Sequence, residues 1–303
     1  MALRGGGEQA SAPPEAASYE FVRAPRTLGA MVASTVGYRS DGADPQLHRG
    51  LPAPYLTLIF SLEGPVVGGD TPEHARGEHA YREEIIVGGL HQRPVYILQP
   101  SREAGVQVAV HPLAARALFG MPAAELTQAA TQGASVLGRS AVDVHQRMLE
   151  RTSWEERFAI LTEYLRRRAL DRGHRAEVRP EVAEAWRWMA RRRGAGSLDD
   201  MARHVAMSRR QLTTLFQREV GAGPKQINRL MRFERARAEV TFSVAGEAAP
   251  DLSEIAARCG FYDHSHLVRD FRQYTGLSPS GWIAEERRNI QAGGHRNGEE
   301  WDA

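Results

Sequence analysis

DLSEIAARCGFYDHSHLVRDFRQYTG, residues 251–276, decides the fold of the second half of this 303-residue chain. It predicts a short helix, a tight turn at Gly260 and a second helix capped by Asp263. Leu267 and Phe271 lie four residues apart, so they predict one buried side for the second helix. The opposite side carries Ser265, Val268, Arg269 and Arg272. A helix–turn–helix unit of this kind fits one major groove of DNA.

The same arrangement occurs earlier, in SLDDMARHVAMSRRQLTTLFQREVG, residues 197–221. Ser197 and Ser208 are expected to cap its two helices, and Gly221 to end the second one. The apolar side of that helix is Leu212, Leu215 and Phe216, and the outward stripe is Arg210, Thr213, Thr214 and Gln217. Between the units, Pro224 favours the start of a long helix that runs to about Phe242. Two units on one chain predict the reading of two neighbouring grooves.

The outward stripes carry side chains that suit the edges of base pairs. Arg210 and Arg269 can each donate two hydrogen bonds to guanine, while the Val268 methyl groups can contact a thymine methyl. The expected base-reading residues are Arg210, Thr213, Thr214, Gln217, Ser265, Val268 and Arg269. The expected phosphate contacts are Arg209, Lys225, Arg229, Arg232, His264, His266 and Arg272. An amphipathic helix can also present a merely solvated face, but two such faces after matched turns favour DNA binding.

The stretch GFYDHSHLVRDFRQYTGLSPSGW, residues 260–282, resembles the signature of the AraC/XylS transcriptional regulators. The matching positions are Ile255, Ala256, Gly260, Phe261, Asp263, Ser265, His266, Arg269, Phe271, Arg272, Gly276, Ser278 and Pro279, while Leu267 replaces the usual Phe. The first unit is similar more loosely, through Ala202, Ser208, Leu212, Phe216 and residues 221–224. The resemblance implies that Arg210, Thr213, Thr214, Ser265 and Arg269 occupy base-reading positions. Residues 243–251 are longer than the usual connection of that family and predict a loop.

The sequence pattern of the first half of the chain predicts β structure followed by helices. YLTLIFSL, EEIIVGGL, PVYILQP and GVQVAVH, between residues 54 and 111, are separated by Gly and Pro clusters, which predicts a small antiparallel sandwich or barrel. Short helices are expected after Pro112, ended by Gly120, and over residues 122–132. This half resembles the cupin-like sensor or oligomerisation domains of such regulators, which implies a small-molecule effector or a dimer.

A helical pair is expected at the end of the first half, over residues 141–150 and from Ser153 onward. In the first helix of the pair, Val144, Met148 and Leu149 lie on one side. In the second helix, Trp154, Phe158, Leu161 and Leu165 form an apolar stripe. That stripe can pack internally or bind a second copy of the chain, and the sequence leaves both alternatives open. A homodimer through helices 141–170 is therefore one expectation.

Charge and composition bound the remaining functions. Residues 175–288 hold 20 Lys or Arg against 15 Asp or Glu, a charge of +5, whereas residues 1–174 sum to −1. A basic second half suits a phosphate backbone. The single cysteine, Cys259, excludes an internal disulfide and is expected in the core. No apolar run is long enough for a membrane span or a secretory signal, so a cytoplasmic protein is expected.

The fold class expected is α+β, with a β-rich domain and helical pair before an all-α domain of two helix–turn–helix units. The expected order is a disordered tail (1–24), a sensor or dimerisation domain (25–172), a linker (173–180), the DNA-binding domain (181–288) and a second disordered tail (289–303). The function expected is a sequence-specific transcription regulator, more often an activator, that binds double-stranded DNA and contacts RNA polymerase.

The rival hypothesis is a metal-dependent cupin-type enzyme with an appended DNA-binding domain. His74, His79, His91 and His111 raise it, but a metal needs several ligands that converge on one point, and this region has no His-x-His pair. No nucleophile–base pair stands out either. The sequence therefore predicts no catalytic residue, cofactor or metal. A third hypothesis, in which the helices bind protein, differs from DNA binding in its salt dependence.

Overall fold

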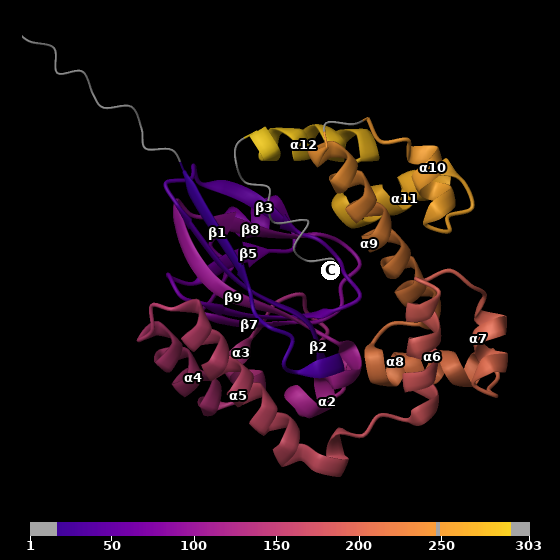
Figure 1. Ribbon diagram of the computed structural model, residues 1–303, viewed down its shortest axis with the longest axis horizontal. Helices are drawn as coiled ribbons and strands as arrows, with labels where there is room; N and C mark the ends of the chain where they lie inside the picture. The colour runs from indigo at the N-terminus through magenta and orange to yellow at the C-terminus, as the bar shows by residue number, and fades with distance from the viewer. Residues whose placement is uncertain (1–16, 247–248, 292–303) are drawn as a thin grey trace, which may run out of the picture.

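The computed structural model describes residues 17–246 and 249–291, with a β-rich part followed by a helical part (Figure 1). The strands are β1 (Ser18–Arg23), β2 (Val32–Asp41), β3 (Gln46–Gly50), β4 (Leu56–Ser61), β5 (Val66–Gly69), β6 (Tyr81–Glu83), β7 (Ile85–Gly88), β8 (Val95–Gln99), β9 (Arg102–Val110) and β10 (Thr131–Gln132). They form a six-stranded sheet in the order β1-β2-β9-β4-β7-β10 and a four-stranded sheet in the order β3-β8-β5-β6. The strand pairs are antiparallel, which confirms the predicted type of β structure.

Helices cover one face of the larger sheet and make up the second half of the chain. The first half contains α1 (Pro72–Arg76), α2 (Ala115–Leu118), α3 (Gly133–Leu137), α4 (Arg139–Leu149) and α5 (Trp154–Arg172). Short 3₁₀ turns lie at η1 (Gly29–Met31), η2 (Pro112–Ala114), η3 (Ala123–Glu125) and η4 (Gly173–Ala176). The second half contains α6 (Pro180–Arg191), α7 (Leu198–His204), α8 (Arg209–Val220), α9 (Pro224–Ala245), α10 (Leu252–Arg258), α11 (His264–Thr275) and α12 (Pro279–Gln291).

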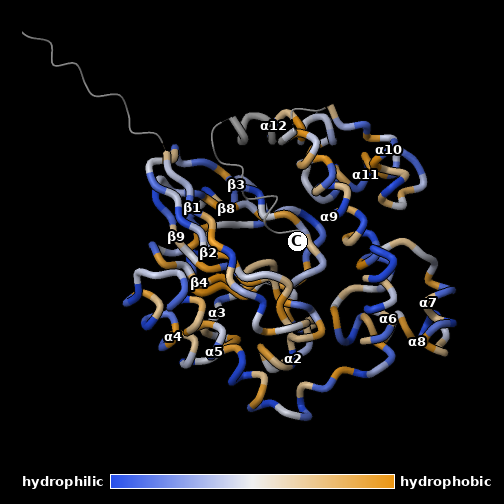
Figure 2. The backbone as a smooth tube through the Cα atoms, in the orientation of Figure 1, coloured by the Kyte–Doolittle hydropathy of each residue, from blue (hydrophilic) through white to orange (hydrophobic). Residues whose placement is uncertain are grey.

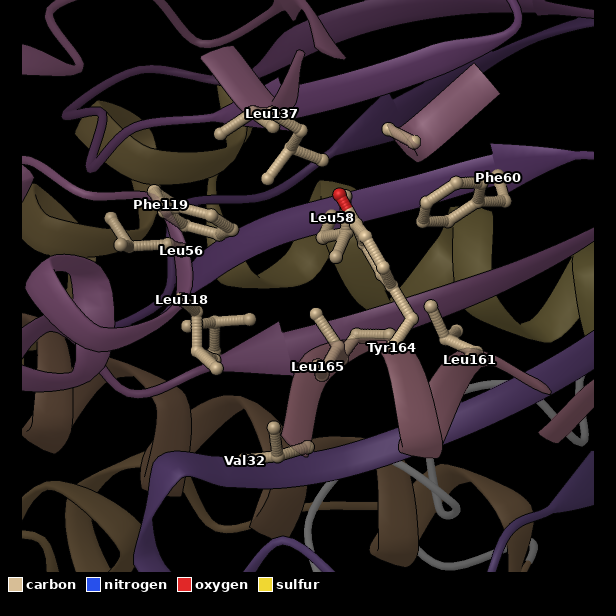
Figure 3. Packing of buried hydrophobic residues seen from close by; sticks show 14 of the residues in the cluster. Val32, Leu56, Leu58, Phe60, Leu118, Phe119, Leu137, Leu161, Tyr164 and Leu165 are labelled. Carbon is tan, nitrogen blue, oxygen red and sulfur yellow. The ribbon is translucent and has the colours of Figure 1, made fainter. Parts of the chain in front are cut away.

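The main core lies between the larger sheet and the helical pair. Leu58 and Phe60 alternate along β4 and are fully buried against α5, whose Leu161 and Leu165 lie opposite them (Figure 3). Hydrophobic residues run along β4 in Figure 2. The ring of Trp154 lies over Gly37 of β2, where a Cβ atom would stand 2.4 Å from the ring. The apolar stripe of α5 therefore packs inside the protein. Of the two alternatives that the sequence leaves open for this stripe, internal packing is correct, and the stripe is not free to bind a second copy of the chain.

Several boundaries differ from the sequence-based expectations. Residues 18–23 of the expected N-terminal tail form β1, because they pair along their whole length with β2. Residues 122–132 form a 3₁₀ turn and the short strand β10 rather than a helix. Leu149 is 41% exposed, although its neighbour Met148 is buried. The helix α12 continues to Gln291, and the rest of the expected C-terminal tail lies outside the described residues.

The helical half contains two cores, one for each helix–turn–helix unit. The first joins α6, α7 and α8 and includes Trp186 and Phe216. The second joins α10, α11 and α12 and includes Phe271 and Trp282. The 22-residue helix α9 contributes to both and runs from one unit to the other (Figure 1). At 1.5 Å rise per residue it is about 33 Å long, close to one turn of B-DNA.

Candidate nucleic-acid interface

Each of the two outward-facing helices, α8 and α11, begins at a side-chain cap. The Ser208 hydroxyl accepts a hydrogen bond from the Gln211 backbone N–H (3.2 Å), and the Gln211 side chain accepts one in return from the Ser208 N–H (3.0 Å). The Asp263 carboxylate accepts from the His266 backbone N–H at 2.7 Å. These caps are the ones that the sequence predicts, and they fix where each helix starts.

Both helices end at a glycine in the left-handed conformation. Gly221 has φ 81° and Gly276 has φ 77°, a region that other residues enter at a cost of about 1–2 kcal/mol. Each glycine N–H donates back to a carbonyl four residues earlier, at Gln217 and Arg272. The chain therefore turns sharply at the end of each helix. Both helices have 12 residues, with a side-chain cap at the start and a left-handed glycine at the end.

The predicted outward stripes are at the surface. Arg210, Thr214, Gln217, Ser265, Arg269 and Arg272 are exposed, and Thr213 and Val268 are half-buried. On the opposite side, Leu212, Phe216, Leu267 and Phe271 are fully buried, whereas Leu215 is only half-buried. Within the described residues each helix therefore offers a mostly polar stripe with cationic and hydroxyl groups, interrupted on α11 by Val268, and such groups can bond base edges.

The residues expected to contact phosphates fall into two groups. Arg209, Lys225, His264 and Arg272 are exposed. Arg209 also pairs with Asp199 on α7, with 3.0 Å between Nε and Oδ1. Lys225 lies in the first turn of α9, beside the end of α8. These four side chains are therefore accessible from the solvent beside α8, α9 and α11.

Arg229 is instead half-buried and bonded to side chains of α11. Its Nη2 atom donates to Asp270 Oδ1 at 2.6 Å and to Gln273 Oε1 at 2.9 Å. The Asp270 side chain is completely buried, so this pair ties α9 to the back of α11. The ion pair raises the Arg229 pKa further above its ordinary value, since the guanidinium faces a carboxylate.

Arg232 and His266 also have partners inside the helical part, and those of Arg232 lie in both units. Arg232 Nη1 donates to the Gly194 carbonyl at 2.8 Å, and its guanidinium lies over the Phe261 ring. The His266 ring meets Phe261 edge-on at 5.3 Å between centroids. A phosphate contact from these side chains, or from Arg229, would compete with their contacts inside the domain.

The β-rich part contacts both helix–turn–helix units. Arg116 of α2 holds Glu219 of α8 through two hydrogen bonds, Nε–Oε1 at 2.7 Å and Nη2–Oε2 at 2.9 Å. Glu219 lies nine residues after Arg210, half a turn around the helix, so this contact is on the side away from the outward stripe. At the other unit, Arg49 of β3 pairs with Glu285 of α12. The stripes therefore stay exposed while the two parts of the chain are joined.

The histidines that suggested a metal have structural partners. His74 Nε2 donates to the His79 carbonyl at 2.9 Å, and His91 Nδ1 donates to the Arg93 carbonyl at 2.6 Å. His111 Nδ1 accepts from the Leu113 N–H, and its ring packs on Trp186 at 4.7 Å. Across residues 17–246 and 249–291, no cluster of three or more His, Cys, Asp or Glu side chains is placed to hold a metal ion.

Cys259 is buried, as the sequence predicts for a core residue. Burial raises the pKa of its thiol to about 12, and nearby Glu239 adds to the effect. No helix in the described part of the chain is both long and apolar enough to cross a bilayer.

A family model described as a helix-turn-helix domain matches residues 201–285, which cover most of both units. The regulator GbdR of Pseudomonas aeruginosa is 33% identical over 82 residues, 27% of this chain and 21% of its own length. The regulator ArgR of the same species is 30% identical over 96 residues, 32% of this chain and 26% of its own length. The helical part of this chain is therefore similar to the helix-turn-helix domains of these transcriptional regulators.

Solved structures are similar to different extents of the chain. An AraC-type DNA-binding protein from Chromobacterium violaceum is 29% identical, with 36% of this chain and 91% of that chain covered and a TM-score of 0.30. ToxT from Vibrio cholerae is 12% identical, with 82% and 97% covered and a TM-score of 0.46. The matched region spans at most about a third of the length of the curated relatives, so it characterises the helix-turn-helix part of the chain rather than the whole chain.

Two features of the site were missed at the level of sequence. Asp270 sits between Leu267 and Phe271 on the buried side of α11, and a lone acid on an apolar face is a signal of a buried ion pair. The Arg116–Glu219 contact joins residues 103 positions apart, and no local pattern announces such a pair.

Proposed function

We propose that this protein is a sequence-specific DNA-binding transcription regulator that reads two adjacent major grooves. The observation that carries the proposal is the pair of capped helices, α8 and α11, held at the two ends of α9 with their polar stripes exposed. The base-reading set is Arg210, Thr213, Thr214, Gln217, Ser265, Val268 and Arg269. Arg209, Lys225, His264 and Arg272 supply the phosphate contacts in this proposal.

The β-rich domain is proposed to modulate DNA binding, because it touches both units through Arg116 and Arg49. In this proposal the protein works in the cytoplasm, activates transcription through RNA polymerase and responds to a small-molecule effector. A homodimer would use a surface of α4 or α5 other than the buried stripe. Partly exposed Val142 and Leu149 of α4, and Leu170 of α5, are the apolar side chains available there.

The first test is the Arg269→Ala variant on a site defined by footprinting. We expect a loss on the order of 1–3 kcal/mol in binding free energy and a relaxed preference at one base pair, because one bidentate contact is lost. Arg139→Ala, an exposed arginine on α4, serves as the charge-matched control and should bind normally. Equal losses on the footprinted site and on random DNA would show that Arg269 is not a base reader.

The second test is Lys225→Ala, which removes an exposed cation at the start of α9. Binding should weaken to the same degree on specific and random DNA, and the slope of log K against log salt should fall by about 1. A loss confined to the specific site would contradict the backbone role. If the wild-type protein bound its target with no salt dependence, the partner would be a protein rather than DNA.

A further inference from the structure

The outer face of the smaller sheet carries a cavity that the DNA-binding function does not use. Leu47, Leu98, Val67 and Arg82 are successive register partners across β3, β8, β5 and β6, so their side chains share one face. These residues line a cavity of about 570 Å³. That volume lies in the ordinary range of small-molecule sites. Its three apolar members are only half-buried, so they form an uncovered hydrophobic floor.

The rim of this cavity is positively charged. Arg76 at the end of α1, Arg82 of β6 and Arg102 of β9 line it, against one acid, Glu63. Glu63 is 3.4 Å from Arg102 Nη2, so one cation is already partly neutralised. Arg76 and Arg82 are exposed. An apolar floor beside two accessible guanidinium groups matches a ligand with an apolar body and a single anionic group.

The same face of the sheet touches the second helix–turn–helix unit. Arg49, Tyr96 and Gly69 form the adjacent row on this face, since alternate residues of a strand point the same way. Arg49 pairs with Glu285 of α12, and the Tyr96 hydroxyl lies 3.7 Å from the position of a Cβ on Gly276, the residue that ends α11. The cavity and the contact with the second unit therefore share strands β3 and β8.

We propose that this cavity binds a small amphipathic anion, a carboxylate or phosphate on an apolar body. We further propose that a bound anion changes the contacts between the smaller sheet and the second helix–turn–helix unit. The apolar body lies on Leu47, Val67 and Leu98, and the anion is bound by Arg82 and Arg76. The effect on DNA rests on the proposed function, whereas the binding site itself does not. The neighbouring contacts at Arg49 and Tyr96 are the route by which the ligand changes the position of α11.

The test is calorimetric titration of the full chain with decanoate and with decyl phosphate, both below their micellar concentrations, and with decanol as the uncharged analogue. We expect saturable one-to-one binding of at least one anion, at least 10-fold tighter than decanol. Arg82→Gln should weaken the anion at least 10-fold and leave decanol unchanged. Leu98→Ser should weaken both. Arg139→Gln, on exposed α4, should alter neither.

Three results would overturn the site: neither anion binds, decanol binds as tightly as the anions, or Arg82→Gln binds them like the wild type. Which of the two anions binds more tightly identifies the headgroup. Arg82→Lys should recover part of the lost affinity, because the charge returns without the planar fork.

A second measurement separates this inference from the proposed function. The affinity for the footprinted DNA site is measured with and without the bound anion, for the wild type and for Arg49→Gln. We expect the anion to change the wild-type affinity at least threefold and the Arg49→Gln affinity less. An anion that binds without changing DNA affinity would overturn the coupling and leave the site intact. A protein that binds the anion but no DNA would overturn the proposed function alone.

Discussion

The Asp270→Asn variant should loosen the attachment of α11 to α9. The wild-type carboxylate is completely buried and accepts a hydrogen bond from Arg229 Nη2 at 2.6 Å. Removing one partner of a fully buried ion pair costs about 3–5 kcal/mol. Arg229 keeps 31% of its side chain exposed, so water can replace part of the lost interaction, and the Asn carbonyl can still accept a hydrogen bond. We therefore expect a loss of about 2 kcal/mol.

Amide hydrogen exchange of the full chain measures this loss where it occurs. At about 1.4 kcal/mol for each tenfold change, 2 kcal/mol predicts roughly 30-fold faster exchange in peptides from α9 and α11. Peptides from α4 and α5 should exchange as in the wild type, because they belong to a separate core. Asp143→Asn, an exposed acid on α4, is the matched control. Unchanged exchange in α11 would refute the view that this ion pair holds the reading helix in place.

Acid should weaken the contact between the β-rich and helical parts through His111, whose pKa burial lowers to about 4 from an ordinary value of 6.5. The folded state keeps the ring neutral against Trp186, so stability falls by at most about 3 kcal/mol as pH drops from 6.5 toward 4. His111→Gln should flatten that part of the pH dependence of thermal unfolding, and an unchanged profile would contradict the assignment. Gly221→Ala should lower the melting temperature more than Gly276→Ala. Both glycines are left-handed, with φ 81° and φ 77°, but the added Cβ would stand 3.0 Å from the Ala124 Cα at Gly221 and 3.7 Å from the Tyr96 hydroxyl at Gly276. Equal losses in the two variants would show that the Ala124 contact is too soft to matter.

The helical half could be predicted closely because its signals are local. Caps at Ser208 and Asp263, glycine ends at Gly221 and Gly276, and apolar spacing within one helix all act over a few residues. The fold class of the first half was also predictable, since short β runs between turn residues are local as well. Its strand order was not, because pairings such as β2 with β9 join residues about 70 positions apart.

Several strands and side-chain roles escaped prediction for physical reasons. β1 contains Tyr19, Glu20 and Arg23 at a sheet edge, where polar residues are tolerated, so its composition resembles a tail. The roles of Arg229 and Arg232 depend on what faces them in space. A cation on the surface of a long helix has the same sequence signature whether it meets a phosphate or a buried Asp270. The outward stripes were predictable because exposure follows directly from helical period.

The division of the helical half into two cores bears on how such a protein can diversify. Among the fully buried residues of α9, the first core ends at Ile227 and the second begins at Leu230, while half-buried Met231 still packs against the first core. Between them lies less than one turn of helix, with Asn228 and Arg229. A recombination crossover within that turn would exchange one helix–turn–helix unit and leave the fully buried residues of each core together, and only the contacts of Met231 and Arg232 with the first unit would have to be kept by the incoming segment. Its main structural requirement would be an acid in the incoming unit to meet Arg229. Under the proposed function, new combinations of DNA half-sites would arise by exchange as well as by point substitution on α8 or α11.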